Sequence, residues 1–242
     1  MIEQQKILFT GGSGLLGSEL KKLFPNSHFP SSSEFNVTKP QQMEEYLKNK
    51  EPDLIFHLAA FTSPPDCDKH PGKALDINII GTSNIVKVCM KKNIKIIYIS
   101  TDYVFEGNKG DYKEEDSLNP VNKYAWSKLG GECAVKLYDN SIIVRTTFGP
   151  EEFPHPKAFE DQWTSRETVS KIAKKIAKLA YKDFKGIIHI GGKRKTVYEY
   201  AKEANPEKEI GKLSTKDVQF KIPEDTSLNT DLYKKIFGED TI

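Results

Sequence analysis

Short, nearly continuous hydrophobic runs alternate with longer amphipathic segments along the first half of the chain. Runs such as 53–58 and 95–100 have the apolar character of strands that are covered on both faces of a parallel sheet. The segments between the runs have the spacing of helices with one apolar face. This alternation predicts βαβ units, and hence an α/β fold with a Rossmann-like, doubly wound parallel sheet. The expected strands are Lys6–Phe9, Ser27–Phe29, Leu54–Leu58, Lys95–Ser100 and Ser141–Val144, and the expected helices are Leu15–Leu23, Gln41–Lys48, Ala74–Lys91 and Asn122–Tyr138.

The pattern changes after Gly149, where a Pro-rich segment indicates a hinge. We therefore expect two domains. Residues 1–149 form the doubly wound domain, and residues 150–242 form a small, reduced C-terminal lobe that is interleaved with the last strands of the sheet. The elements expected after the hinge are a helix with a basic outer face at Thr168–Lys182, a strand at Ile187–Ile190 and a helix at Val197–Ala204.

The composition is that of a globular protein, with 37% hydrophobic and 29% charged residues and a formal net charge of +2. This balance gives no reason to expect nucleic acid or a membrane surface as a partner. The N-terminus lacks the apolar core of a signal peptide, and there is no run of about 18 apolar residues. Three widely spaced cysteines, Cys67, Cys89 and Cys133, suit a reducing compartment, so we expect a cytoplasmic protein.

Four glycines stand between the first expected strand and the first expected helix, in the stretch Thr10–Gly17. Gly11 suits the backbone of a tight turn, Gly14 allows a diphosphate to approach the main chain, and Gly17 lets the helix pack close to the strand. The N–H groups of the first helical turn then face the phosphates, and the helix dipole favours their charge. The pattern therefore predicts a dinucleotide site in residues 1–149.

The residues after the second expected strand bear on which dinucleotide is bound. A carboxylate about 20 residues beyond the glycines usually holds a ribose 2′-hydroxyl, and that residue is missing here. Pro30–Glu34 brings serine hydroxyls to the strand end instead. Because hydroxyls tolerate a 2′-phosphate better than an aspartate does, Ser31 is a candidate cofactor contact. NADP(H) is favoured, with NAD(H) as the alternative.

Tyr124 and Lys128 lie four residues apart in an expected helix, so both side chains lie on one face. A Tyr hydroxyl has an ordinary pKa of about 10, and a nearby ammonium stabilises the phenolate and lowers that pKa. We therefore expect Tyr124 to give or accept a proton at a carbonyl or alcohol. A hydroxyl at the carboxyl end of the fourth expected strand, from Ser100 or Thr101, can hold the substrate oxygen.

The order of these motifs resembles the extended short-chain dehydrogenase/reductase superfamily. The motifs that carry the resemblance are Thr10–Gly17, Leu58–Ala60, Asn78–Thr82, Ser100–Phe105 and Tyr124–Lys128. Ser100–Gly107, with Asn119-Pro120 ahead of Tyr124 and Gly131-Glu132 after Lys128, is most similar to the dTDP-4-dehydrorhamnose reductase family. The resemblance spans nearly the whole chain and is most specific in residues 1–150.

The resemblance implies a nicotinamide-dependent reductase for the 4-keto group of a nucleotide-linked 4-keto-6-deoxy sugar, so the implied partner is a nucleotide sugar. Tyr124 would be the general acid, Lys128 would hold the nicotinamide ribose, and Thr101 would hydrogen-bond the reacting oxygen. The resemblance implies further cofactor contacts at Ser13, Gly14, Leu15, Leu16, Asn36, Val37, Ala59, Ala60, Phe61 and Asn78, and sugar contacts at Tyr103 and Phe148. A homodimer is left open as a second partnership.

The chain departs from the family pattern in three places. Asn36 stands where the family has Asp, and Phe148 stands where Trp is common. Only residues 147–160 separate the fifth-strand motif from Asp161-Gln162, where the family inserts a helix, so the substrate lobe is shortened. Because binding energy from remote substrate parts helps to position the reacting centre, we expect a working reductase with an altered sugar preference.

Two other functions stay open. One is a sugar-nucleotide epimerase or dehydratase with bound NAD(P), although a dehydratase needs Glu where Tyr103 stands and an epimerase/reductase of the GDP-fucose type needs a Cys–His pair. The other is a non-catalytic, dinucleotide-binding regulatory subunit, which the shortened lobe favours. His57 and His189 are expected to be core imidazoles, and His155 is a candidate substrate contact. No cluster has metal-ligand spacing, so no metal is expected.

Overall fold

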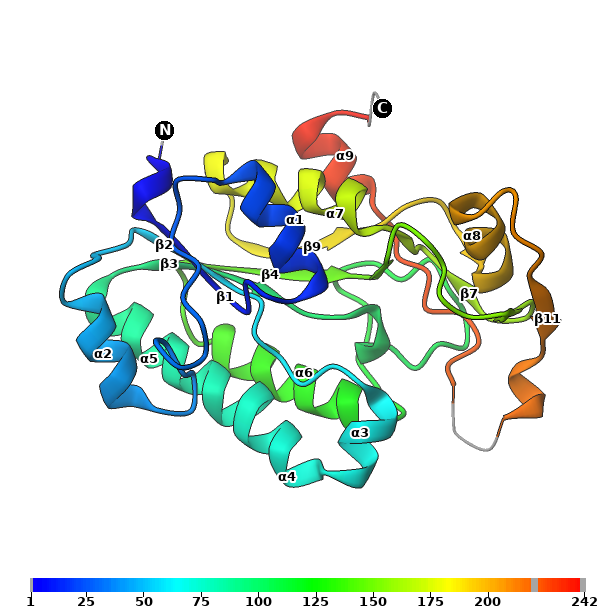
Figure 1. Cartoon of the computed structure of the whole chain (residues 1–242), viewed down its shortest axis with the longest axis horizontal. Coiled ribbons are helices and arrows are strands. Elements are labelled where there is room, and N and C mark those ends of the chain that lie inside the picture. The colour runs from blue at the N-terminus through cyan, green and yellow to red at the C-terminus, as the bar shows by residue number, and fades with distance from the viewer. Residues whose placement is uncertain (1, 219–221, 240–242) are drawn as a thin grey trace.

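A five-stranded parallel sheet lies at the centre of the computed structural model, which describes residues 2–218 and 222–239 (Figure 1). The strands are β1 (Ile7–Thr10), β2 (Leu54–His57), β3 (Lys95–Ile99), β4 (Ser141–Thr146) and β9 (Gly186–Ile190). They pair in the order β1-β2-β3-β4-β9, and each neighbouring pair is parallel. The predicted Rossmann-like α/β fold is confirmed. The last strand comes from the chain beyond residue 150, so the second half of the sequence completes the sheet.

Helices cover both faces of this sheet (Figure 1). One face carries α1 (Leu15–Leu23), α7 (Val169–Ala177) and α9 (Asp231–Phe237), and the other carries α2 (Pro40–Leu47), α5 (Thr82–Lys92) and α6 (Lys123–Val135). Two short helices, α3 (Pro64–Lys69) and α4 (Pro71–Ala74), and a π-helical segment, Leu75–Gly81, lead into α5. Strands enclosed in this way must be apolar on both sides, which explains their continuous hydrophobic runs.

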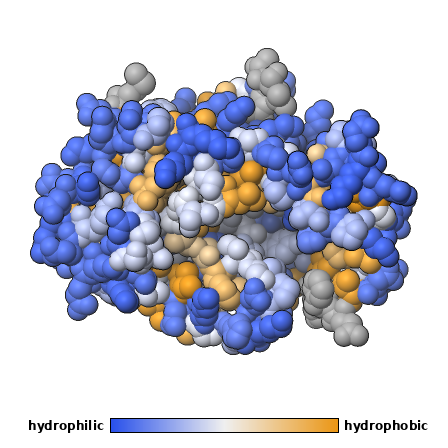
Figure 2. Space-filling model, viewed as in Figure 1, coloured by the Kyte–Doolittle hydropathy of each residue, from blue (hydrophilic) through white to orange (hydrophobic). Residues whose placement is uncertain are grey.

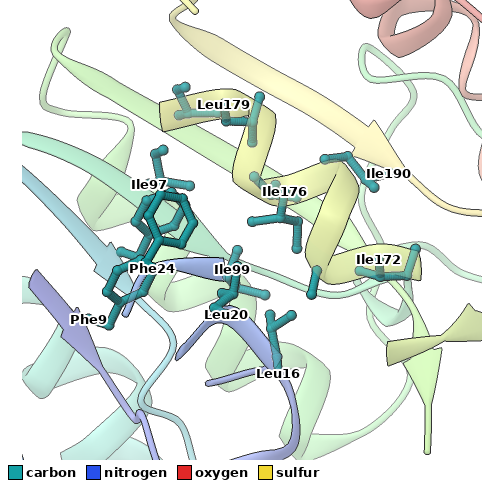
Figure 3. Close-up of a cluster of buried hydrophobic side chains, with 14 of the residues drawn as sticks. Phe9, Leu16, Leu20, Phe24, Ile97, Ile99, Ile172, Ile176, Leu179 and Ile190 are labelled. Atoms are coloured by element: carbon teal, nitrogen blue, oxygen red, sulfur yellow. The ribbon is translucent and has the colours of Figure 1, made fainter. Parts of the chain in front are cut away.

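Figure 3 shows side chains of α1 and α7 packed together with those of the strands on one face of the sheet. Leu16 and Leu20 lie one helical turn apart on α1, and Ile172 and Ile176 do the same on α7; all four are buried against the strands. This spacing places each pair on one face of its helix. Burying a Leu or Ile side chain contributes about 1.5–3 kcal/mol, so these faces hold both helices on the sheet.

The C-terminal lobe is built from short elements at one end of the sheet (Figure 1). These are β5 (Phe148–Gly149), β6 (Lys157–Phe159), β7 (Trp163–Thr164), β8 (Glu167–Thr168), β10 (Lys195–Thr196), α8 (Val197–Ala204) and β11 (Gly211–Leu213). The lobe has its own small core, in which Phe153 packs with Tyr200 and Ala201 of α8. The capping box of Thr196 and Glu199 explains where α8 begins.

Four predicted elements differ from the structure. The helix predicted at Thr168–Lys182 ends at Ala177 and continues as a 3-10 segment, Lys178–Tyr181. The strand predicted at Ser27–Phe29 is reduced to a single bridge, in which His28 pairs with Leu8 at the edge of the sheet. The single helix predicted at Ala74–Lys91 is interrupted by the π-helical segment and ends at Lys92. The helix predicted to reach Tyr138 ends at Val135. None of the helices in the described ranges combines the length and apolar content that a bilayer crossing needs.

Candidate active site

A cleft of about 1080 Å³ opens at the carboxyl edge of the sheet. Thr10 ends β1, and residues that end or follow β2, β3 and β4 line the same space, as expected for a ligand site in an open α/β sheet. The face seen in Figure 2 is hollowed near its centre. The predicted site residues on the cleft wall are Gly11, Ser13, Gly14, Leu15, Leu16, Gly17, Ser31, Asn36, Val37, Ala59, Ala60, Thr101, Tyr103, Tyr124, Lys128 and Phe148.

The glycine turn forms a bare stretch of this wall. Gly11 has a φ of +70°, and a Cβ there would lie 2.7 Å from the Ala59 nitrogen, so the turn admits only glycine. A Cβ on Gly17 would lie 2.5 Å from the Gly11 carbonyl oxygen, which explains why α1 can begin so close to β1. Gly14 is the N-cap of α1 and supplies no capping side chain. The first amides of α1 are therefore suited to a diphosphate.

The loop after His28 lines the part of the cleft where the sequence predicts the adenosine. Glu34 folds back so that its Oε2 accepts hydrogen bonds from the Ser31 nitrogen, at 2.8 Å, and from the Ser31 Oγ, at 2.7 Å. The expectation of hydroxyls without a carboxylate at this strand end is therefore wrong. Lys21, one turn beyond Gly17 on α1, also lines the cleft. The loop and α1 thus bring a carboxylate, a cation and serine hydroxyls to this part of the cleft.

Thr101, Tyr124 and Lys128, the predicted catalytic trio, all line the cleft. The helix that carries Tyr124 and Lys128 begins where the Asn122 side chain accepts a hydrogen bond from the Ala125 nitrogen, at 2.9 Å. This cap sets the first turn of α6. Thr101 lies two residues after the end of β3 and is buried, and its side chain acts to lower the pKa of Tyr124 in part.

The charge states in the trio differ from the prediction. Burial raises the pKa of Tyr124 above its ordinary value, and the hydrogen bond with Thr101 offsets only part of the rise. Burial lowers the pKa of Lys128 to about 7, while Glu132 acts in the opposite direction. The expectation of a lowered Tyr124 pKa is therefore wrong for the protein alone, because loss of water around the phenol dominates. Tyr124 is held as a neutral phenol that has a proton to give.

The cleft is also lined by Tyr103, Phe148 and a residue that the sequence analysis missed, Arg166. Gln162 donates a hydrogen bond from its Nε2 to the Tyr103 hydroxyl at 3.1 Å, and the Tyr103 and Tyr124 ring centroids are 6.5 Å apart. The positive charge of Arg166 lowers the pKa of Tyr103 in part, although burial raises it overall. Arg166 thus places a cation on the Tyr103 side of the cleft.

Three buried polar atoms of the cleft wall have no hydrogen-bond partner in the described part of the chain. They are Ser100 Oγ, Thr146 Oγ1 and Arg166 Nε. Buried polar atoms in proteins are nearly always paired, so these three are available to a polar ligand. Together with the bare glycine turn, they fit a dinucleotide with a polar substrate beside it.

Two predicted cofactor contacts, Phe61 and Asn78, do not line the cleft. The Asn78 side chain is buried and accepts a hydrogen bond from the Phe61 nitrogen, at 2.7 Å, while it donates to the Phe61 carbonyl oxygen, at 2.9 Å. It also donates to Ser127 Oγ at 2.8 Å. Asn78 therefore fixes the loop after β2 against α6, and Ala59 and Ala60 of that loop reach the wall.

The histidines lie away from the cleft. His57 and His189 are fully buried in strands, as predicted, and each has at least one hydrogen-bonded ring nitrogen. His155 is exposed, packs edge-on against Phe153, and does not line the cleft, so its predicted substrate contact is wrong. Over residues 2–218 and 222–239, no group of three or more His, Cys, Asp or Glu side chains could hold a metal ion.

The parallel sheet, the bare glycine turn and the Tyr–Lys pair beside it define the class of protein. It is an NAD(P)-dependent oxidoreductase of the short-chain dehydrogenase/reductase type. Within this class, the chain belongs to the RmlD substrate binding domain family, whose family model matches residues 5–149.

Three relatives illustrate the similarity. The structure of a hypothetical dTDP-4-dehydrorhamnose reductase from Sulfolobus tokodaii is 32% identical, with a TM-score of 0.85, and the match covers 97% of this chain and 96% of that one. A dTDP-4-dehydrorhamnose reductase from Bacillus anthracis str. Ames, in complex with NADP, is 25% identical with a TM-score of 0.85, and the match covers 95% and 90%. The methionine adenosyltransferase 2 subunit beta of Bos taurus is 27% identical, and the match covers 83% of this chain and 71% of that protein.

Proposed function

We propose that this protein uses NADPH to reduce the 4-keto group of a nucleotide-linked 4-keto-6-deoxy sugar. The observation that carries the proposal is the convergence of Thr101, Tyr124 and Lys128 on a cleft that also contains the bare glycine turn. The similarity to dTDP-4-dehydrorhamnose reductases supports the same substrate class. We also propose that residues 1–149 bind the dinucleotide and that the later lobe binds the sugar nucleotide.

Each residue of the trio has a distinct task in the proposed reaction. The bound cofactor supplies the hydride to C4 of the sugar. Negative charge then develops on the C4 oxygen, and the neutral phenol of Tyr124 donates its proton to that oxygen. The Thr101 hydroxyl, which donates to Asp102 in the free protein, would turn its proton to the same oxygen and orient it toward the phenol. Lys128 holds the nicotinamide ribose, and its positive charge stabilises the phenolate that proton transfer leaves behind.

The part of the cleft that is lined by Tyr103 and Arg166 is suited to a nucleotide sugar. Tyr103 is held by Gln162 with its ring near Tyr124, so it can pack beside the sugar that Tyr124 protonates. Arg166 lines the same side and has an unpaired, buried Nε. A guanidinium pairs with phosphate through charge-assisted hydrogen bonds, so we assign Arg166 to the diphosphate of the substrate.

We propose NADPH as the preferred cofactor, with NADH as the alternative. Lys21, Ser31 and Ser32 line the cleft and offer a cation and hydroxyls to a 2′-phosphate. The relative from Bacillus anthracis that is in complex with NADP supports this choice. Glu34 acts against it, because its carboxylate lies on Ser31 and repels a phosphate.

A second function, as a regulatory subunit without catalysis, is favoured by the match to methionine adenosyltransferase 2 subunit beta. The two proposals differ in what the cleft does with a substrate. A reductase turns over, whereas a regulatory subunit needs only to bind the dinucleotide. The complete trio in the cleft favours the reductase.

The experiment mixes the purified protein with NADPH and a dTDP- or UDP-linked 4-keto-6-deoxyhexose and follows the loss of nicotinamide absorbance. The expected result is turnover of the nucleotide-linked sugar and none of the free sugar, because the diphosphate contributes binding energy. Tight cofactor binding without turnover of any such sugar contradicts the reductase and supports the regulatory subunit.

A further inference from the structure

The amine of Lys128 lies in an unusual environment for a cation. Lys128 is only 3% exposed, and its Nζ lies 4.2 Å from the centre of the Tyr98 ring. The nearest acidic residue along α6 is Glu132, which is bound instead by the buried Arg145, with Nη2 to Oε2 at 2.9 Å. Among the described residues, no carboxylate forms an ion pair with Lys128. The Lys128 ammonium therefore lies against the electron-rich face of Tyr98 and not in an ion pair.

Tyr98 itself is held firmly. Its ring is fully buried on β3, and its hydroxyl donates a hydrogen bond to the Lys128 carbonyl oxygen at 3.1 Å. The hydroxyl lies so close to the Gly131 Cα that any Cβ at position 131 would collide with it. Tyr98 is thus fixed to the same turns of α6 that carry Lys128, and its ring cannot move away from the amine.

A line of buried polar side chains runs from this tyrosine to the start of the glycine turn. The Thr82 side chain acts to lower the pKa of Tyr98 in part, and its Oγ1 lies 3.0 Å from His57 Nε2. The other ring nitrogen of His57 lies 2.8 Å from the Oγ1 of Thr10, the last residue of β1. The buried side chains between the glycine turn and Lys128 therefore form one connected polar group.

We infer that Tyr98 is a positioning residue, whose ring face holds the Lys128 ammonium at the cleft wall and in its charged form. This inference rests on the proposed function, in which a charged Lys128 binds the nicotinamide ribose. Cation–π contacts gain strength when the cation is desolvated, and Lys128 is almost completely buried. Without the ring, the amine would lose its charge more readily and would bind the ribose less well.

The charged and titratable groups around Lys128 act in different directions. Glu132 on α6 favours the ammonium but is shared with Arg145. His57 on β2 is neutral, because burial and the charge of Lys128 lower its pKa to about 3. Tyr124 on α6 is also neutral, since its pKa is raised. Tyr98, whose own pKa is raised well above the ordinary value, remains a neutral ring at any working pH.

The test compares Tyr98→Phe, which keeps the ring, with Tyr98→Leu, which removes it. NADPH affinity is measured from nicotinamide fluorescence between acidic and alkaline pH, without a sugar, so the result does not depend on turnover. We expect Tyr98→Phe to retain most of the affinity. Tyr98→Leu should lose about tenfold and should show its alkaline loss of binding about one pH unit lower.

The control is Phe24→Leu, which removes a buried ring on the opposite face of the sheet. It should lower stability without moving the pH profile of binding.

If Tyr98→Leu does not fold, mono-, di- and trifluorinated phenylalanine at position 98 keep the shape of the ring and withdraw its electrons stepwise. Affinity should fall with each fluorine. The inference is overturned if the pH dependence of NADPH binding is the same in Tyr98→Leu as in Phe24→Leu. It is also overturned if the NADPH affinity does not change with the number of fluorines. If NADPH binding shows the expected pH dependence but the protein reduces no sugar, only the proposed function is contradicted.

Discussion

Thr226 donates a hydrogen bond from its Oγ1 to Asp102 Oδ2 at 2.6 Å, and both residues are buried. The two are 124 positions apart in the chain. Asp102 Oδ1 accepts a second hydrogen bond, from the Oγ1 of its neighbour Thr101, at 3.1 Å. The late segment 222–230 is therefore tied to the loop that positions Thr101, the threonine of the proposed catalytic trio.

Replacing Thr226 by Val should loosen this connection. The Asp102 carboxylate would lose one donor while it stays buried, which costs about 1–3 kcal/mol of the free energy of unfolding. Turnover should fall as well, because Thr101 is bonded to the same carboxylate. Urea unfolding and steady-state rates measure the two effects. Thr226→Ser keeps the hydroxyl and should restore both; a Val variant with wild-type turnover would show that the connection does not reach the site.

The carboxylate of Glu34 should set the balance between the two nicotinamide cofactors. Its removal in Glu34→Gln takes a negative charge away from Ser31 and should raise the affinity for NADPH about two- to fivefold relative to NADH. Titration of both cofactors at low salt measures the ratio. Glu44→Gln removes a carboxylate that pairs with Lys91 outside the cleft, and it should leave the ratio unchanged. An unchanged ratio in Glu34→Gln means that Glu34 does not face the 2′ position.

Two buried histidines should make the fold sensitive to mild acid. Burial lowers the pKa of both His57 and His189 to about 3, whereas an unfolded histidine titrates near its ordinary value of 6.5. Between these values the unfolded chain binds more protons, so stability is full above about pH 6.5 and falls as the pH drops toward 3. From about pH 7.5 to 5.5, the loss should be about 3 kcal/mol for the two groups together.

Chemical denaturation at these two pH values measures that loss. His189→Gln carries no titratable ring and should show roughly half of the pH dependence, even if its stability at neutral pH is lower. A free energy of unfolding that is the same at both pH values would contradict neutral burial of the imidazoles.

Helices with a regular spacing of apolar residues and a clear first and last residue were predictable from the sequence. The helices Leu15–Leu23 and Val197–Ala204 have the predicted bounds, because an apolar face and a local start signal define each of them. The strand predicted at Ser27–Phe29 was not formed, since it lies between Pro25 and Pro30 at the sheet edge and has only β1 to pair with. The π-helical insertion near Asn78 was not predictable, because one extra residue barely changes an apolar period.

Within the site, the residues next to a motif were found and the isolated ones were missed. The sequence places Thr101 just beyond a strand end, and it places Tyr124 and Lys128 on one face of a helix. These positions predicted that the three side chains line one site. Arg166 lies in a short loop between β7 and β8, and only the folded lobe brings it to Tyr103. Lys21 could have been found, since it lies one helical turn beyond Gly17. The burial that raises the pKa of Tyr124 has no local signal in the sequence.

The central claim is that the phenol of Tyr124 gives a proton to the substrate oxygen, and Tyr124→Phe tests it most directly. The variant keeps the ring that lines the cleft and removes only the hydroxyl. The rate of NADPH-dependent reduction should fall by about 10²–10⁴, while the dissociation constant for NADPH stays near that of the wild type. Reduction by Tyr124→Phe at the wild-type rate, with normal cofactor binding, would contradict the account.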